Sequence, residues 1–79
     1  MSGTKRNIRF EPVPRPGRKT EIYRVMTVHY DVELGTIEWH SPWRQYVFFP
    51  ADLTYWSAGC LRDVTEQISR LMAERRERR

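Results

Sequence analysis

The sequence contains a single cysteine, Cys60, and four glycines among its 79 residues. One cysteine excludes an internal disulfide, and it leaves a structural zinc site without the thiolate pairs that such sites usually use. The glycines do not form the Gly-rich loop that cradles phosphate groups in nucleotide-binding proteins. We therefore expect the protein to work in a reducing compartment, and we expect neither a zinc-dependent nor a P-loop function.

Long apolar runs are also absent, because charged residues make up 30% of the chain and hydrophobic residues 39%. No segment approaches the roughly 20 apolar residues of a membrane-spanning helix. No apolar run of about seven residues follows Lys5, Arg6 and Arg9, as a signal peptide would require. These absences predict a cytoplasmic protein that does not bind membranes.

The charges are unevenly distributed, although the formal net charge is only +4. Cations outnumber carboxylates in residues 1–19 and 70–79, whereas carboxylates outnumber cations in residues 20–69. Any contact with a polyanion is therefore expected from the ends of the chain. The candidate contacts with phosphate or with an acidic protein surface are Lys5, Arg6, Arg15, Arg18, Lys19, Arg75 and Arg76. The alternative is that these cations only keep the ends solvated.

Residues 1–19 form a basic, proline-rich arm. Pro12, Pro14 and Pro16 cannot donate backbone hydrogen bonds, and their alternation favours extended polyproline geometry. We interpret the arm as flexible, either disordered or loosely docked on the domain. The alternation of apolar residues around Phe10 leaves open an added edge strand.

Residues 20–79 predict one small domain that begins with three strands. A β-branched and aromatic run from Ile22 to Val32 predicts the first strand, and a turn is expected over Asp31–Gly35 because glycine tolerates positive φ. Thr36–His40 and Arg44–Phe49 predict the next two strands on either side of Ser41-Pro42. Short connections between consecutive strands indicate an antiparallel meander.

A C-terminal helix is predicted over about residues 58–76, with Ser57 as its N-cap. Its apolar stripe is Leu61, Val64, Ile68, Leu71 and Met72, and Gln67 is expected among the residues that face water. One stripe and one sheet face can bury each other. The predicted fold is therefore α+β, with a three-stranded antiparallel β-meander packed on one helix.

Aromatic residues are concentrated around the Ser41-Pro42 turn. Trp39, Trp43, Arg44 and Tyr46, with Phe48, resemble the aromatic and cationic sets that stack on unpaired bases or dominate protein contacts. The alternative for Trp39, Tyr46 and Phe48 is that they pack against the helix, because a small domain needs large core residues. The sequence does not show which way a strand faces.

No set of residues predicts catalysis. The spacing of His29, His40 and Cys60 matches no metal-ligand pattern, and no carboxylate pair is placed by pattern in a cleft. A Cys60–His40 nucleophile pair is the alternative to a buried thiol. We expect no enzyme activity, no metal and no cofactor.

Residues 37–50, with the pattern WxxPWRQYxFFP, and residues 58–64, with CLRD, resemble a family of short uncharacterised proteins from actinobacterial phages and prophages. The resemblance implies a phage context and no particular mechanism. We expect a non-enzymatic phage accessory protein that binds and modulates a host protein through the Trp39–Arg44 turn and a sheet edge. The alternative is a nucleic-acid-binding protein that uses basic termini and exposed rings. An uncovered edge strand also leaves a homodimer open.

Overall fold

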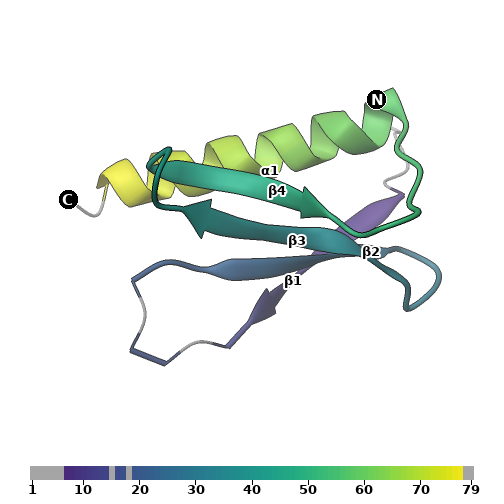
Figure 1. Cartoon of the computed structure of the whole chain (residues 1–79), viewed down its shortest axis with the longest axis horizontal. Coiled ribbons are helices and arrows are strands. Elements are labelled where there is room, and N and C mark those ends of the chain that lie inside the picture. Colours follow the sequence, from purple (N-terminus) through teal and green to yellow (C-terminus); the bar gives the residue numbers. More distant parts are fainter. Residues whose placement is uncertain (1–6, 15, 18, 78–79) are drawn as a thin grey trace.

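A computed structural model describes residues 7–14, 16–17 and 19–77. Of the predicted contact residues, Lys5, Arg6, Arg15 and Arg18 lie outside this part of the chain. The described residues form five elements (Figure 1), namely β1 (Ile8–Val13), β2 (Ile22–Thr27), β3 (Glu33–His40), β4 (Gln45–Pro50) and α1 (Ala58–Glu77).

The four strands form one antiparallel sheet in the order β1-β2-β3-β4, and α1 lies along one face of it (Figure 1). The predicted α+β class, the meander and the C-terminal helix are confirmed. The predicted number of strands is wrong, because residues 8–13 of the proline-rich arm pair with β2.

Burial of apolar side chains explains the extra strand. Ile8 is only 1% exposed, and Phe10 packs against the core opposite Val25. Fully burying an aliphatic side chain contributes about 1.5–3 kcal/mol. Pro12 is compatible with this strand because β1 lies at the sheet edge, where one row of backbone groups needs no partner.

The turn after β2 differs from the predicted one. The chain reverses over residues 28–32, where the amide of Thr27 donates to the carbonyl of Val32 over 3.1 Å. Gly35 lies within β3 and faces Pro50 of β4. A Cβ atom at Gly35 would lie 2.4 Å from the carbonyl oxygen of Phe49. Gly35 is thus required for the close approach of two strands and not for a turn.

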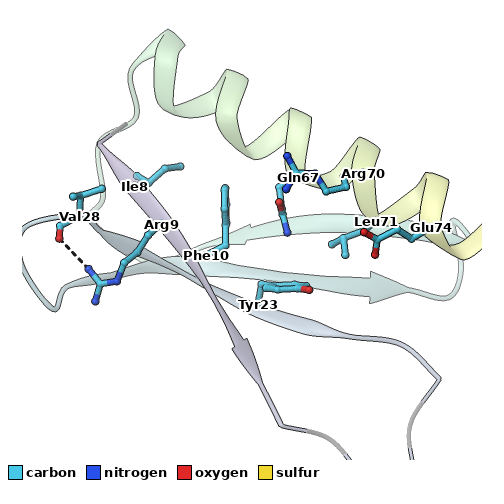
Figure 2. Close-up of a pocket in the computed structure, with 9 residues that line it drawn as sticks. All are labelled: Ile8, Arg9, Phe10, Tyr23, Val28, Gln67, Arg70, Leu71 and Glu74. Carbon is cyan, nitrogen blue, oxygen red and sulfur yellow. Dashed lines mark hydrogen bonds between the residues drawn. The ribbon is translucent and has the colours of Figure 1, made fainter. Parts of the chain in front are cut away.

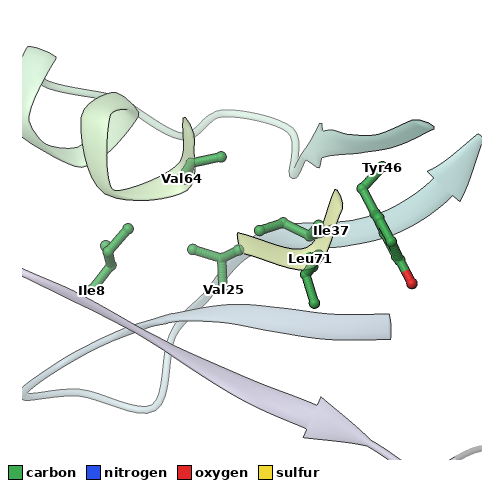
Figure 3. Close-up of a cluster of buried hydrophobic side chains, with 6 residues drawn as sticks. All are labelled: Ile8, Val25, Ile37, Tyr46, Val64 and Leu71. Atoms are coloured by element: carbon green, nitrogen blue, oxygen red, sulfur yellow. The ribbon is translucent and has the colours of Figure 1, made fainter. Parts of the chain in front are cut away.

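The core lies between the sheet and α1 (Figure 3). Each strand contributes to it, and α1 contributes two residues, so that all five elements share one cluster of buried side chains. The cluster consists of Ile8, Val25, Ile37, Tyr46, Val64 and Leu71.

The helix begins and ends close to the predicted residues, but its buried stripe is shifted. Ser57 caps it as predicted, because its Oγ accepts a hydrogen bond from the amide of Cys60 over 3.1 Å. Gln67, predicted to face water, is 8% exposed, whereas Leu61 is 47% exposed. Gln67 lies one turn from both Val64 and Leu71, so helical periodicity places it on the face toward the sheet. Within the described residues, no helix is long and apolar enough to cross a membrane.

Candidate functional site

The β3–β4 turn holds the most prominent of the predicted binding residues. Two backbone hydrogen bonds order it: the amide of Trp43 donates to the carbonyl of His40 over 3.2 Å, and the amide of Arg44 donates to the carbonyl of Ser41 over 3.0 Å. Arg44 has a left-handed backbone with φ of 55°. This conformation ends the turn and returns the chain to β4.

Behind the turn, Trp39 and Tyr46 pair directly across β3 and β4. Their rings meet edge to face, with centroids 5.3 Å apart and planes at 79°. The guanidinium carbon of Arg75, from the last part of α1, lies 4.0 Å from the centroid of the Trp39 ring. A guanidinium over an indole face is a cation–π contact, worth about 0.5–2 kcal/mol depending on desolvation. Trp39 therefore joins the helix to the turn.

A hollow of about 190 Å³ lies between the turn and the C-terminal half of α1. We call it the arginine pocket. It combines three guanidinium groups with one indole and one thioether. Its lining residues are Trp39, Arg44, Met72, Arg75 and Arg76. Figure 1 shows why residues so distant in sequence meet, because the C-terminal part of α1 runs beside the β3–β4 turn.

The arginines of the pocket have no carboxylate partners among the described residues, where the ion pairs involve Arg9 and Arg24 instead. Arg9 lies 2.9 Å from both Glu11 and Asp31, and these contacts, with Glu11 the stronger, raise the pKa of its guanidinium. Carboxylates therefore neutralise the cations near β1 and β2, while the arginine pocket stays positively charged.

A row of aromatic rings extends from the turn onto the sheet face that α1 does not cover. The His40 ring meets Trp43 edge to face at 4.8 Å and Phe49 at 6.4 Å between centroids. Trp43 is 65% exposed and Phe49 is 44% exposed. The turn thus presents a solvent-exposed indole that its neighbours hold in place.

The structure separates the predicted site residues into two groups. Trp43 and Arg44 are exposed, and Arg75 and Arg76 lie beside Arg44 in the arginine pocket. Tyr46 is 4% exposed, and its hydroxyl accepts a hydrogen bond from the amide of Glu21 over 3.1 Å. It is a core residue, and its ring is not available to a partner.

The other predicted rings and cations follow the same division. Trp39 and Phe48 are partly buried and pack against the core. Trp39 nevertheless lines the arginine pocket. Lys19 is exposed in the connection between β1 and β2 and does not line it.

Sequence reasoning missed two contributors to this end of the molecule. Met72 lines the arginine pocket, and its sulfur lies 3.5 Å from the amide of Tyr46. His40, considered as a metal ligand or a base but not as part of the aromatic set, lies between the rings of Trp43 and Phe49. The alternation of β3 and β4 could have revealed that His40 and Phe49 share a face.

A second hollow, of about 490 Å³, lies between α1 and the β1–β2 side of the sheet (Figure 2). Ile8, Phe10, Tyr23, Val28 and Leu71 supply its apolar surface. Arg9, Gln67, Arg70 and Glu74 complete it, so that both signs of charge are present. Burial, and then the hydrogen bond that its hydroxyl donates to Glu21, raise the pKa of Tyr23.

The residues considered for metal binding or nucleophilic chemistry do not gather at either hollow. Cys60 lies in the first turn of α1, at the end of the helix away from the β3–β4 turn that follows His40. Within the part of the chain that the structure describes, no group of three or more His, Cys, Asp or Glu residues could hold a metal ion.

Comparison with known proteins places the chain among small phage proteins. It is 33% identical over 70 residues to an uncharacterised 9.3 kDa protein of Acholeplasma phage L2, and the match covers 89% of this chain and 90% of that protein. The chain belongs to the family of this phage protein. No family model and no solved structure matches the chain.

Proposed function

We propose that this chain is a non-enzymatic phage accessory protein that binds a host protein through the β3–β4 turn and thereby modulates that protein. The observation that carries the proposal is the exposure of Trp43, which is 65% exposed on an ordered turn directly before Arg44. Trp and Arg are the residue types that most often dominate the energy of protein–protein contacts.

The local structure favours recognition over mere exposure. The Trp43 indole is held edge-on by His40 at 4.8 Å, so little side-chain entropy is lost when a partner covers it. The turn adjoins β4, which is an edge strand of the sheet. A partner can therefore bury the indole and contact the strand edge at the same time.

A phage context supports this choice of partner. Membership in a family of small phage proteins makes the macromolecules of the bacterial host the natural targets. We further propose that the protein acts in the host cytoplasm and that the resemblance of residues 37–50 and 58–64 to actinobacterial phage proteins reflects its origin.

Nucleic-acid binding is the second candidate, and the arginine pocket beside an exposed indole favours it. Two observations weigh against it. Arg75 covers one face of the Trp39 ring, which leaves that indole a poor stacking platform. The open sheet face also carries Glu38, which has no cationic partner among the described residues and would repel a phosphate backbone.

Site-specific photocrosslinking tests the proposal. Trp43 is replaced by the photoreactive p-benzoylphenylalanine, and a control protein carries the same replacement at Tyr55, a 95% exposed aromatic residue in the β4–α1 connection. We expect irradiation in host cells to yield a protein adduct at position 43 that is absent at position 55.

The other outcomes separate the candidates. A nuclease-sensitive adduct at position 43 supports nucleic-acid binding instead. If the two positions trap the same set of molecules, or if position 43 traps none, the turn is not a recognition site.

A further inference from the structure

We propose that the arginine pocket is a carboxylate-binding site that receives an acidic segment of the partner protein. This inference rests on the proposed function and specifies the chemistry of its partner. A carboxylate enters the hollow between Arg44, Arg75 and Arg76, while another part of the partner covers Trp43, which directly precedes Arg44 in the turn.

The charge of the pocket is the first argument. Three guanidinium groups line a hollow of about 190 Å³, and none of them has a carboxylate partner among the described residues. Like charges placed close together destabilise a folded domain, and this domain is small enough that such a cost matters. An anion from outside the chain removes this repulsion.

The geometry of the pocket is the second argument. Arg75 is held over the Trp39 ring at 4.0 Å, and Arg44 projects from the ordered end of the turn, where its backbone is left-handed. Guanidinium groups bind carboxylates through paired, charge-assisted hydrogen bonds that are about twice as strong as neutral ones. Because Arg75 is already oriented, less entropy is lost on binding.

The surroundings of the pocket favour a compact acidic segment over a polynucleotide. A polynucleotide needs a continuous cationic track for its phosphates and several open rings for its bases. Here three guanidinium groups gather in a single hollow of about 190 Å³, and the ion pairs of Arg9 and Arg24 lie on the remote strands β1 and β2. One carboxylate-rich segment matches this arrangement.

The three tryptophans make the site observable in one experiment. Trp39 lines the pocket and Trp43 directly precedes the pocket residue Arg44, whereas Trp56 packs on Phe48 near the start of α1, with centroids 4.6 Å apart. The three indole N–H signals of ¹⁵N-labelled protein are assigned with single Trp→Phe variants. The probe is a peptide of alternating Glu and Ser, and the controls are its Gln counterpart and an oligothymidylate.

We expect the Glu peptide to shift the signals of Trp39 and Trp43 in a saturable, salt-sensitive manner and to leave the Trp56 signal in place. Arg44→Gln and Arg76→Gln should each weaken binding about tenfold or more, which is the effect of losing a hydrogen bond to a charged group. Both residues are exposed, and circular dichroism verifies that the variants fold. The control Arg62→Gln removes the same charge from an exposed position near the start of α1 and should change the affinity less than about twofold.

Three results would overturn the inference: no shift with the Glu peptide at low ionic strength, equal losses in all three arginine variants, or tighter binding of the oligothymidylate through the same arginines. The test is independent of the proposed function. If a host protein is trapped at position 43 but the Glu peptide does not bind, the proposed function stands and the carboxylate-binding site is refuted. If the peptide binds but no protein is trapped, the carboxylate-binding site stands and the proposed function is refuted.

Discussion

The close approach of β3 and β4 at Gly35 makes a sharp prediction for Gly35→Ala. A Cβ atom there would lie 2.4 Å from the carbonyl oxygen of Phe49, 2.8 Å from the Phe48 ring and 3.0 Å from the Cα atom of Pro50. Two of these three atoms belong to the backbone, so no rotamer change can remove the clash. The φ angle of +157° adds strain for any residue with a side chain.

The magnitude follows from these two terms. Overpacking costs about 1–3 kcal/mol, and holding a non-glycine residue in a disfavoured backbone conformation costs about 1–3 kcal/mol. We therefore expect Gly35→Ala to lower the free energy of unfolding by about 3 kcal/mol. A domain of this size has a total of only roughly 3–5 kcal/mol, so the variant should be largely unfolded at moderate temperature.

Urea denaturation followed by circular dichroism measures this loss, and Gly59→Ala is the matched control. A Cβ at Gly59 meets only the Ser57 hydroxyl at 3.8 Å, within the first turn of α1. Alanine is favoured over glycine in a helix, so this control should be about 0.5 kcal/mol more stable than the parent. Equal stability of Gly35→Ala and the parent would refute the argument that the close approach of β3 and β4 requires glycine.

Two further predictions concern stability. The pKa of Tyr23 is raised by burial and by its hydrogen bond to Glu21, so the unfolded state, whose tyrosine ionises near pH 10, loses its proton first as the pH rises. The stability that Tyr23 contributes is therefore present below about pH 10 and lost above it. In urea titrations between about pH 9 and 11, Tyr23→Phe should lose less free energy of unfolding than the parent. Parallel curves of stability against pH for the two proteins would contradict this. Ser57→Ala removes the N-cap contact to Cys60 and should lower the free energy of unfolding by about 1 kcal/mol in the same assay. The control Ser69→Ala changes an exposed serine of α1 and should lower it by almost nothing. Equal effects of the two substitutions would show that Ser57 does not act as a cap.

Local patterns were sufficient to predict most of the secondary structure. The β-branched run after Glu21, the Ser41-Pro42 interruption and the stripe of α1 each depend on neighbouring residues, and a strand, a turn and a helix occur there. The bounds of the first two predicted strands were wrong, because β2 ends at Thr27 and β3 begins at Glu33. The strand β1 could not be predicted in the same way. Its place in the sheet depends on Ile8 filling a site between β2 and α1, which is a tertiary contact.

The orientation of β3 and β4 was the main uncertainty of the sequence, and the structure resolves it. Trp39, Tyr46 and Phe48 face α1 together with Ile37, so the three rings first of all stabilise the fold. Of the two alternatives that the sequence left open for these rings, packing in the core and stacking on bases, the structure shows packing. Trp43 escapes the pattern because it lies in the turn and outside the alternation of either strand.

The arginine pocket could not be predicted, because it depends on the length of a helix. Arg75 and Arg76 were recognised as basic residues near the C-terminus, but their proximity to Arg44 requires α1 to run back along the sheet as far as the turn. Spacing along the sequence carries no signal for this contact. The pairing of Trp39 with Arg75 likewise follows from the packing of α1.

Charge pairing, more than position in the sequence, determines what the molecule can attract. The sequence indicated an acidic body with basic ends, yet in the folded protein some of those carboxylates face Arg9 and Arg24. Arg44, Arg75 and Arg76, which have no carboxylate partner among the described residues, meet in one hollow. At physiological salt the field of exposed charges falls off within about 8 Å. The arginine pocket therefore acts on a partner that is already close, and it orients an acidic segment at the turn more than it attracts one from a distance. For this reason, we expect added salt to weaken the binding of the Glu peptide far more than it weakens contacts made by the Trp43 indole.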